Sequence, residues 1–311
     1  MTTQNNLKIV ALAGGVGGAK LAHGLANVLP PENLTIVVNT GDDFEHYGLY
    51  ICPDLDTVCY TLAGLANPET GWGRVSETWN AFANASKLGG PNWFNLGDQD
   101  LGTHLERTRR LKSGQCLSEI TRDFCRAWGI QHTILPMSDS PVRTIVETDE
   151  GELAFQEYFV HRRCEPRVRG FRFEGAEIAE PAPGAVEAVR SADAVVFCPS
   201  NPWVSIDPIL KILPQIEKPV FAVSPIIGGE TVKGPAAKMY RELGIEPSAL
   251  AVARHYRERL TGFVLDEVDK QLEGELMGLS IKTTVTNTLM ESHEDRIRLA
   301  QEIIGFIGKM L

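Results

Sequence analysis

"KIVALAGGVGGAKLAHGLANV", residues 8–28, joins an apolar run to a cluster of glycines and an amphipathic segment. Leu21 and Leu25 recur with Leu29 at helical spacing, so the stretch predicts a strand, a tight turn and a helix. A second apolar run, "LTIVVNT", follows at residues 34–40. Strand–helix–strand units whose strands are apolar throughout are typical of parallel sheets buried on both faces. We therefore expect an α/β fold, with a Rossmann-like, mostly parallel sheet and helices on both faces.

The α/β pattern returns in the second half of the chain, after two interruptions. Residues 57–130 hold several helical patterns joined by turns rich in Gly, Pro and Asn, which predicts a helical insertion. Residues 142–175 alternate between apolar and polar and turn at "DEG", which predicts a β-hairpin excursion. The remaining predicted elements are strands near 132–135, 194–198, 219–224 and 262–266 and helices near 183–191, 205–212, 234 and 292–310. We expect a single Rossmann-like domain over residues 1–311.

The composition is that of an acidic globular protein. With 43% hydrophobic and 23% charged residues, the 311-residue chain can bury a sizeable core. Its net charge of −10 argues against a nucleic-acid-binding surface, which needs a basic stripe. Nucleotide substrates stay possible, because acidic proteins bind them through Mg²⁺ held on carboxylates.

The cysteines and the N-terminus indicate a cellular compartment. The six cysteines are scattered, without a Cys-x-x-Cys pair or a Cys/His ligand spacing. We interpret them as reduced thiols of a cytoplasmic protein and expect no zinc site. Residues 1–8 carry no apolar stretch, so we expect no secretory signal, and no segment approaches the length of a membrane span.

The glycine cluster fits neither common phosphate-binding pattern. A P-loop would have glycine at Ala19 and Ser or Thr at Leu21, and a dinucleotide fingerprint would have its third glycine at Lys20. Glycines after a strand can nevertheless bring backbone N–H groups close to an anion at a helix N-terminus. The candidates are Gly14, Gly15, Gly17 and Gly18, with Lys20 reaching back to a phosphate. The alternative is a tight strand–helix turn with a solvated lysine.

Four aspartates follow the second predicted strand: Asp42, Asp43, Asp54 and Asp56. In an extended loop, Asp54 and Asp56 would point the same way. A few carboxylate oxygens, completed by substrate phosphates, are how Mg²⁺ is usually held. The alternative is that Asp54 caps a helix beginning near Thr57 and that Asp42 belongs to a turn. The cluster as a whole favours a metal site.

Polar segments follow other predicted strands as well: "PMSDSPVRT" at 136–144, "PSNPWVS" at 199–205 and "SPIIGGETVKGPAAK" at 224–238. Because the carboxyl ends of parallel strands share one edge, we expect an extended polar cleft there. In "NLGDQDLGTHLER", Asp98 or Asp100 is a candidate helix cap, and His104 is expected to be packed or solvated. No G-x-S-x-G, H-E-x-x-H or Cys/His pairing is legible. The residues therefore favour metal-assisted phosphoryl or nucleotidyl transfer over covalent catalysis.

Eight blocks, taken together and in order, resemble one family. They are "AGGVGGAKL", "VVNTGDDF", "CPDLDTV", "GWG…ETW", "NLGDQDLGTH", "LPMSD", "PSNP" and "SPIIGG…KGPAAK". The set is similar to the 2-phospho-L-lactate transferases of coenzyme F420 biosynthesis, whose bacterial members are also described as phosphoenolpyruvate transferases. The resemblance runs from about residue 7 to the C-terminal helix. It implies a Rossmann-like core, a transfer reaction and a homodimer.

The resemblance also implies a reaction. The acceptor would be the deazaflavin Fo, 7,8-didemethyl-8-hydroxy-5-deazariboflavin. The donor would be a guanosine diphosphate diester, lactyl- or enolpyruvyl-2-diphospho-5'-guanosine. The terminal ribityl hydroxyl of Fo would attack the distal phosphorus, GMP would leave, and Mg²⁺ would neutralise the diphosphate. Whether the transferred group is 2-phospholactyl, phosphoenolpyruvyl or 3-phosphoglyceryl stays open.

By position, the resemblance assigns four sets of residues. The catalytic residues would be Asp42 and Asp56, and the Mg²⁺ ligands would be Asp42, Asp43, Asp54 and Asp56. The Fo-binding residues would be Asp56, Asn95, Asp98, Met137 and Ser138. The donor nucleotide would contact Gly14, Gly15, Gly17, Gly18, Lys20, Ser200, Asn201, Ser224 and Gly228. Many archaeal members carry lysine in place of Asn95, so this chain lacks a charge there.

Two other readings compete with this one. The gluconeogenesis-factor family resembles these transferases in its glycine loop and fold, so a non-catalytic nucleotide or sugar-nucleotide-binding regulator is the alternative. Trp93 and Phe94, beside "NLGD", suit a flat deazaflavin acceptor or core packing. An NAD-dependent oxidoreductase is weakened by the broken fingerprint and by the lack of an acidic residue closing the second strand.

Overall fold

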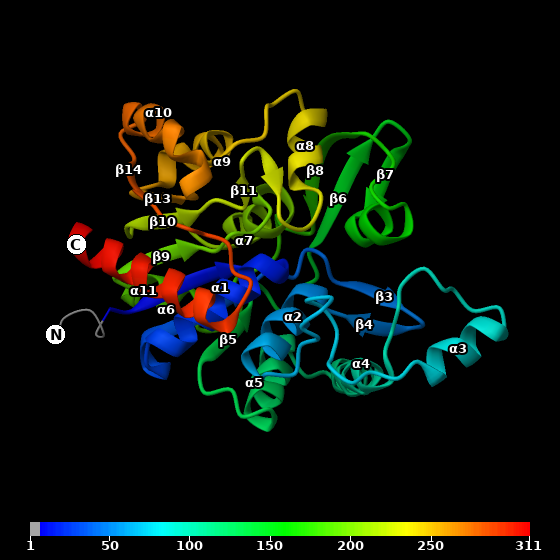
Figure 1. Cartoon of the computed structure of the whole chain (residues 1–311). Coiled ribbons are helices and arrows are strands. Elements are labelled where there is room, and N and C mark those ends of the chain that lie inside the picture. Colours follow the sequence, from blue (N-terminus) through cyan, green and yellow to red (C-terminus); the bar gives the residue numbers. More distant parts are fainter. Residues whose placement is uncertain (1–6) are drawn as a thin grey trace.

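At the centre of the computed structural model, which describes residues 7–311, seven parallel strands form one sheet (Figure 1). The strands are β1 (Ile9–Ala13), β2 (Leu34–Val38), β5 (Thr133–Pro136), β9 (Ala194–Phe197), β10 (Val220–Val223), β13 (Gly262–Leu265) and β14 (Lys282–Val285). Their order is β14-β13-β10-β9-β1-β2-β5, with every neighbouring pair parallel. This is the doubly wound order, in which the direction of winding reverses between β1 and β9. The predicted Rossmann-like sheet is confirmed.

Helices cover both faces of this sheet, which explains why its central strands are apolar at every position. One face carries α1 (Gly15–Val28), α2 (Pro53–Leu62) and α11 (His293–Met310). The other face carries α6 (Ala185–Ser191), α7 (Asp207–Ile212), α8 (Ala236–Glu242) and α9 (Ala249–Tyr256). Ile9 and Ala11 of β1 belong to the first core, whereas Val10 and Leu12 belong to the second. Neither side of β1 meets water, so polar alternation is absent from its sequence.

Two insertions lie to the right of the sheet in Figure 1. The first holds β3 (Phe44–His46), β4 (Leu49–Ile51), α3 (Asn80–Lys87), α4 (Asp98–Lys112) and α5 (Leu117–Ala127). The second is an antiparallel sheet in the order β7-β6-β8, from β6 (Arg143–Thr148), β7 (Gly151–Ala154) and β8 (Val168–Glu174). The β-excursion is therefore confirmed as antiparallel structure, but it has a third strand beyond the predicted hairpin.

One local prediction is wrong in a way that matters for the site. The segment "PDLD" was expected to be an extended loop, but α2 begins at Pro53 and places Asp54 and Asp56 in its first turn. Proline is favoured at the first helical position because its fixed φ suits a helix. An N–H group there would have no hydrogen-bond acceptor within the helix, so its absence costs nothing. Consequently the two carboxylates do not point the same way.

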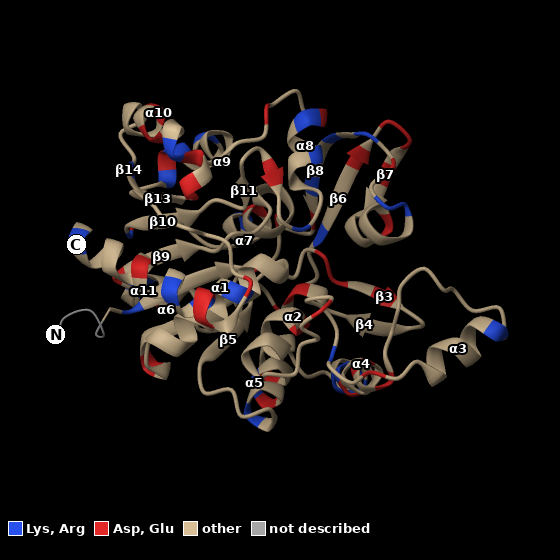
Figure 2. Ribbon diagram, in the orientation of Figure 1, with Lys and Arg blue, Asp and Glu red and all other residues tan. Residues whose placement is uncertain are grey.

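Several short elements were not predicted. They are β11 (Ile226–Ile227), β12 (Glu230–Thr231), α10 (Glu273–Gly278), the 3₁₀ turns Pro31–Asn33, Arg257–Arg259 and Glu267–Leu272, and the π-helical turns Glu157–His161 and Pro202–Ile206. Lysine and arginine are interspersed with aspartate and glutamate along the described ribbon (Figure 2). None of the helices within residues 7–311 combines the length and the apolarity that crossing a membrane requires. We retain the single domain over residues 1–311 as a proposal, since β1 contributes to both cores of the sheet.

Candidate active site

The carboxyl ends of β1 and β9 open into a cavity of about 470 Å³. It lies where the winding of the sheet reverses, which is where open α/β sheets bind their ligands. The predicted site residues that line this cavity are Gly14, Gly15, Gly17, Lys20, Asp42, Asp54, Asp56, Asn95, Ser200, Asn201 and Ser224. The structure thus gathers the exits of several strands around one space, as the sequence led us to expect.

The glycine cluster is not a loop but the beginning of α1, with Gly14 at the N-cap. The Gly14 N–H donates to Ser200 Oγ (3.2 Å), and Ser200 Oγ donates to the Gly14 carbonyl (2.8 Å). A Cβ at Gly17 would lie 2.3 Å from the Pro199 carbonyl oxygen, and a Cβ at Gly18 would lie 2.6 Å from Ser200 Oγ. These glycines therefore let α1 approach the "PSNP" segment. Gly18 is buried in that contact and does not line the cavity.

The N-terminus of α1 faces the cavity without an acidic residue in its own first turn. The Asp54 carboxylate, from α2, accepts a hydrogen bond from the Gly15 N–H. Lys20 lies one turn further along α1 and donates to the Met290 carbonyl (2.6 Å). Burial lowers the pKa of the Lys20 ammonium. The Lys20 ammonium and the positive end of the α1 dipole thus lie at the same end of the cavity, where both favour the binding of an anion.

Asp42 and Asp54 form the buried acidic centre of the cavity. Asn39 donates to Asp54 Oδ2 (2.9 Å), and its own side-chain oxygen accepts from the Gly41 N–H (2.9 Å). Asp42 Oδ1 is buried without a hydrogen-bond partner. Burial, together with the charge of Asp54, raises the pKa of Asp42 well above its usual range. Burial also raises the pKa of Asp54 to about 6.

Asp43 is buried behind this centre and does not line the cavity. It lies beside Cys52, and burial raises its pKa to about 7. The neighbouring positive charges of Arg143 and Arg107 act in the opposite direction but do not outweigh the loss of water. Its predicted role as a metal ligand stays a prediction.

Asp56 is paired with a residue that the sequence did not single out. Arg107, on α4, is buried and donates through both terminal nitrogens to the two oxygens of the Asp56 carboxylate. The same guanidinium lies 3.2 Å from His104 Nδ1. The spacing of His104 and Arg107 by three residues puts both on one face of α4, a signal that could have suggested a buried pair.

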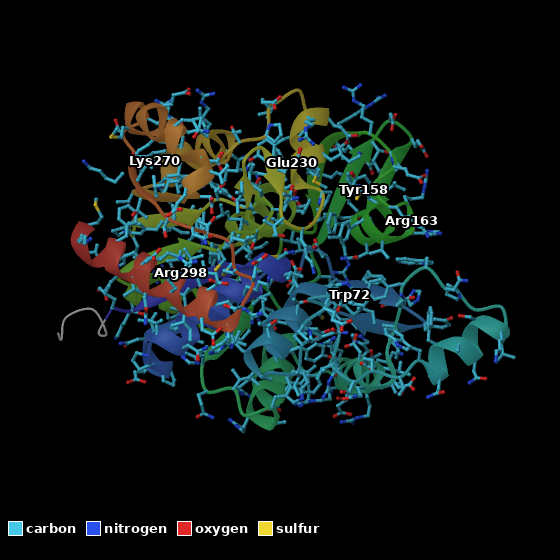
Figure 3. The ribbon with its side chains drawn as sticks, viewed as in Figure 1. Trp72, Tyr158, Arg163, Glu230, Lys270 and Arg298 are labelled. Atoms are coloured by element: carbon cyan, nitrogen blue, oxygen red, sulfur yellow. The ribbon has the colours of Figure 1, made fainter. Side chains whose placement is uncertain are left out.

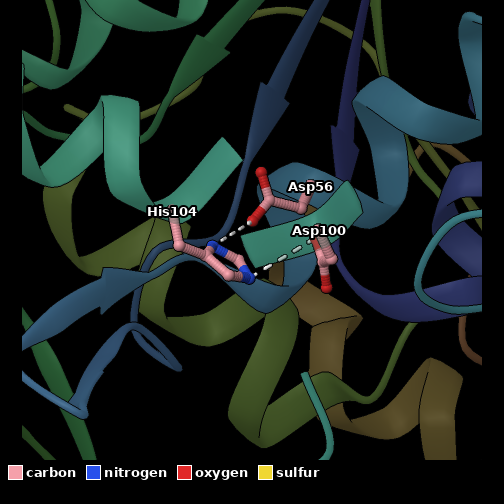
Figure 4. Close-up of side chains that lie close together, drawn as sticks. All are labelled: Asp56, Asp100 and His104. Atoms are coloured by element: carbon pink, nitrogen blue, oxygen red, sulfur yellow. Dashed lines mark ion pairs between the residues drawn. The ribbon is translucent and has the colours of Figure 1, made fainter. Parts of the chain in front are cut away.

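Asp56, Asp100 and His104 lie close enough together to hold a metal ion, with ligand atoms within 4.8 Å of one another (Figure 4). His104 Nδ1 lies 3.7 Å from Asp56, and His104 Nε2 lies 3.4 Å from Asp100. The Tyr60 hydroxyl also donates to Asp100 Oδ1 (2.7 Å). Asp100 and His104 line the cavity, whereas the sequence indicated Asp100 only as a candidate helix cap and His104 only as a packed or solvated side chain.

Aromatic side chains line the other part of the cavity: Trp93, Phe94, Phe155 and Phe159. Phe94 packs edge-on against Phe44 of β3, with ring centroids 4.8 Å apart. Trp93 stacks on His161 at 5.2 Å, which joins the first insertion to the second. Such surfaces suit a flat, conjugated ligand.

Besides Gly18, the cavity lining does not include the predicted Fo- or donor-binding residues Met137, Ser138 and Gly228. Met137 is fully buried in the second core of the sheet. The Ser138 hydroxyl donates to the Glu180 carbonyl (2.6 Å), and the Gly228 N–H donates to Asp269 Oδ2 (3.0 Å). Each has an internal partner or core packing, so their roles as ligand contacts stay predictions.

Asp98 also lies outside the lining, at the start of α4. Its carboxylate accepts from the Thr78 hydroxyl (2.6 Å) and from the N–H groups of Asn80 and Ala81. These hydrogen bonds lower the pKa of Asp98. The residue therefore caps α3 rather than its own helix, and its contact with Fo stays a prediction.

Residues 9–299 match the family described as 2-phospho-L-lactate transferase CofD. The chain belongs to this family. It is 42% identical to the phosphoenolpyruvate transferase of Streptomyces griseus over 310 residues, 96% of this chain and 98% of that one. It is 41% identical to the 2-phospho-L-lactate transferase of Methanopyrus kandleri over 314 residues, 98% of this chain and 99% of that one. The predicted family is confirmed, and the regulator alternative is not favoured.

A solved structure supports the fold alone. A Bacillus halodurans protein described as a member of the upf0052 family superposes with a TM-score of 0.62 at 13% sequence identity. The match covers 96% of this chain and 98% of that one. The overall fold of the chain therefore belongs to an architecture that has been seen experimentally.

Proposed function

We propose that this transferase moves a phospholactyl or phosphoenolpyruvyl group from a guanosine diphosphate diester to the terminal ribityl hydroxyl of Fo, releasing GMP, in coenzyme F420 biosynthesis. The observation that carries the proposal is that one cavity is lined by the N-terminus of α1, by buried carboxylates and by aromatic rings. Group transfer between two substrates needs both binding surfaces around one reactive centre.

The donor lies at the glycine end in this proposal. The N–H groups at the start of α1 and the Lys20 ammonium face the diphosphate. Ser200, which is tied to Gly14 by two hydrogen bonds, keeps the "PSNP" segment against the helix. Asn201 and Ser224 line the same space and supply polar contacts to the nucleotide.

The acceptor lies at the aromatic end. Trp93 and Phe94 give the deazaflavin ring a flat apolar surface, and Asn95 is an uncharged polar contact beside them. Asp56 is held in one orientation by Arg107, so its carboxylate offers a fixed acceptor to the substrate hydroxyls.

The reaction forms one P–O bond and breaks another. The ribityl oxygen attacks the distal phosphorus, and the bond from that phosphorus to the GMP oxygen breaks, so GMP carries away the electron pair. We assign Asp42 and Asp56 to positioning the attacking hydroxyl beside the donor. The hydroxyl proton passes to a general base as the new P–O bond forms.

The buried carboxylates fit a magnesium ion. Asp42 Oδ1 has no hydrogen-bond partner, and Asp54 lies beside it, so the centre offers the hard oxygen ligands that Mg²⁺ prefers. Asp56 fits less well as a ligand, because both of its oxygens already accept hydrogen bonds from Arg107. When bound, Mg²⁺ would neutralise charge on the diphosphate. From the family we also propose a cytoplasmic homodimer.

Product analysis tests this function. The purified protein is incubated with Fo, Mg²⁺ and each candidate donor in turn, namely the lactyl, enolpyruvyl and 3-phosphoglyceryl guanosine diphosphates, and product masses are read. We expect one donor to give a phosphodiester of Fo and an equal amount of GMP. Asp56→Asn should slow the transfer by at least about tenfold, because an oriented carboxylate acceptor is lost. Absence of product with every donor would favour a nucleotide-binding regulator instead.

A further inference from the structure

The cavity is covered at the glycine end by a short segment, residues 67–73, which we call the strap. Thr70, Trp72 and Gly73 of the strap line the cavity. The strap is closed on itself by hydrogen bonds from the Asn67 N–H to the Gly73 carbonyl (3.1 Å) and from the Gly71 N–H to the Asn67 carbonyl (2.9 Å). It therefore behaves as one unit at the mouth of the cavity.

Lys233 joins the strap to the opposite side of the mouth. It follows β12, lines the cavity, and donates from its ammonium group to the Thr70 carbonyl. Gly71 brings the strap close to this lysine and to α1. A Cβ at Gly71, whose φ is +75°, would lie 2.9 Å from Val16 Cγ1 and 3.0 Å from Lys233 Nζ. Lys233, the strap and the first turn of α1 thus meet at one point.

Lys233 has no acidic partner at ion-pair distance among residues 7–311. Within residues 7–311 its ammonium makes one hydrogen bond, to a backbone carbonyl, and no ion pair. An ammonium group has three N–H donors, so two stay available for a ligand. Lys20 likewise donates to a backbone carbonyl, that of Met290. After burial itself, the positive charges of Arg296 and Lys233 lower the pKa of Lys20, and the carboxylates of Glu291 and Asp295 oppose them with smaller effects. Lys233 and Lys20 therefore lie within electrostatic reach of one another.

Lysines that share a cavity with a helix N-terminus repel one another, and the arrangement is stabilised when an anion lies between them. We propose that Lys233 binds the donor's diphosphate together with Lys20 and thereby holds the strap closed over the bound donor. The inference rests on the proposed function, because it takes the guanosine diphosphate donor as the ligand. Lys233 is then a donor-binding residue outside the glycine turn, and its hydrogen bond to Thr70 links donor binding to the closed position of the strap.

Equilibrium binding of GDP tests the inference without requiring the transfer reaction. Lys233→Ala and Lys233→Arg are compared with wild type by calorimetry, using GDP and GMP as probes. We expect K233A to bind GDP about tenfold more weakly, as for one lost charge-assisted contact, and K233R to bind nearly as well as wild type. GMP, with one phosphate, should lose less affinity than GDP.

Lys270→Ala is the matched control. Lys270 is also an exposed lysine, but it lies outside the cavity lining and on the other side of the molecule from Trp72 of the strap (Figure 3). The same unit of charge is removed, so a general electrostatic effect would weaken both variants. We expect K270A to bind GDP as wild type does.

Hydrogen–deuterium exchange separates the strap from the glycine turn. With saturating GDP, wild type should show slower exchange at residues 14–20 and at the strap, whereas K233A should protect only residues 14–20. If K233A matches K270A in affinity and its strap is protected, Lys233 is not a donor-binding residue and only this inference falls. If wild type itself fails to bind GDP, the proposed donor class falls and the inference with it.

Discussion

Asp54 and Asp56 stand two residues apart in the first turn of α2, yet different partners hold their carboxylates. Asp54 faces Asn39 and the N-terminus of α1, whereas Asp56 faces Arg107 on α4. Successive helical positions diverge around the axis, so neighbours in sequence serve separate parts of the cavity. In the proposed function, Asp54 therefore lies at the donor end of the cavity and Asp56 at the acceptor end.

The Asp56–Arg107 pair should matter strongly for stability because both groups are buried. Arg107→Met leaves a buried carboxylate without its partner, which costs about 3–5 kcal/mol. We expect urea denaturation to show a loss of that size. Adding Asp56→Asn in the same chain removes the uncompensated charge and should recover part of it.

Arg109→Met is the control for this prediction, since Arg109 is on the same helix and pairs with Glu106 in water. An exposed ion pair contributes about 0–1 kcal/mol, so this variant should unfold close to wild type. Equal losses for the two variants would contradict the assigned role of the buried pair.

At the level of elements, the sequence predicted β1, α1 and β2 because an apolar run, glycines and leucines at helical spacing occur together. It did not predict α2 from Pro53, since "PDLD" resembles a turn unless the helical preference for proline at the first position is applied. The strand β14 was missed because "KTTV" is partly exposed at the sheet edge. Runs of apolar residues predict the fully buried strands of the sheet, but they do not reveal a partly exposed strand at its edge.

The same contrast applies to the candidate site: residues that directly follow a strand were predicted, and residues paired across distant elements were not. The sequence pointed to several residues that line the cavity, because each follows a recognisable strand: Gly14, Gly15, Gly17, Asp42, Asp54, Ser200 and Asn201. Arg107 was not, because its pairing with Asp56 joins positions 51 residues apart, and only the packing of α4 on β4 brings them together. Lys233 was missed for the same reason, since its partner lies in the strap.

The contact of α1 with the "PSNP" segment leads to a prediction about Gly17. Gly17→Ala places a methyl group 2.3 Å from a backbone carbonyl oxygen, so the helix or the segment must move. Overpacking of this kind costs about 1–3 kcal/mol. We expect a lower free energy of unfolding and, because the N-terminus of α1 is displaced, weaker GDP binding in calorimetry.

Gly102→Ala provides the comparison, because Gly102 is inside α4 and a Cβ there would meet nothing within 4 Å. Alanine is favoured over glycine in a helix by about 0.5–1 kcal/mol, so this variant should be slightly more stable than wild type. An unchanged G17A would show that the contact with Pro199 does not exclude a side chain at position 17. A destabilised G102A would show that free space and helix preference do not decide the effect of alanine in these helices.

Across the whole molecule, the cavity combines the sheet, both insertions and the strap around a centre that is poorly solvated. Asp42, Asp43 and Asp54 are all buried there, and the pKa of each is raised. Three carboxyl groups in one low-dielectric region disfavour their ionised forms. The arrangement is costly for stability unless a cation or a ligand donor compensates, which agrees with a site built for a substrate complex.

This cost predicts how the stability of the protein depends on pH. A carboxyl group with a raised pKa binds its proton more tightly in the folded chain than in the unfolded chain, where its usual pKa is 3.8. Its contribution is therefore fully present below the unfolded value and is lost as pH rises through the folded value, which is about 7 for Asp43 and well above the usual range for Asp42. Without divalent cations, we expect the free energy of unfolding to fall by about 1–2 kcal/mol between pH 6.5 and pH 8.

Two variants test which carboxyl group causes this fall. Asp42→Asn should make the pH dependence of the unfolding free energy smaller. Asp98→Asn should leave it unchanged, because the pKa of Asp98 is lowered rather than raised. Urea denaturation at the two pH values measures both slopes. Asp43 should leave a smaller slope in D42N, so only an undiminished slope in that variant would exclude Asp42 as a source. Added Mg²⁺ should restore stability at pH 8 in wild type more than in D42N, because the ion compensates an ionised Asp42.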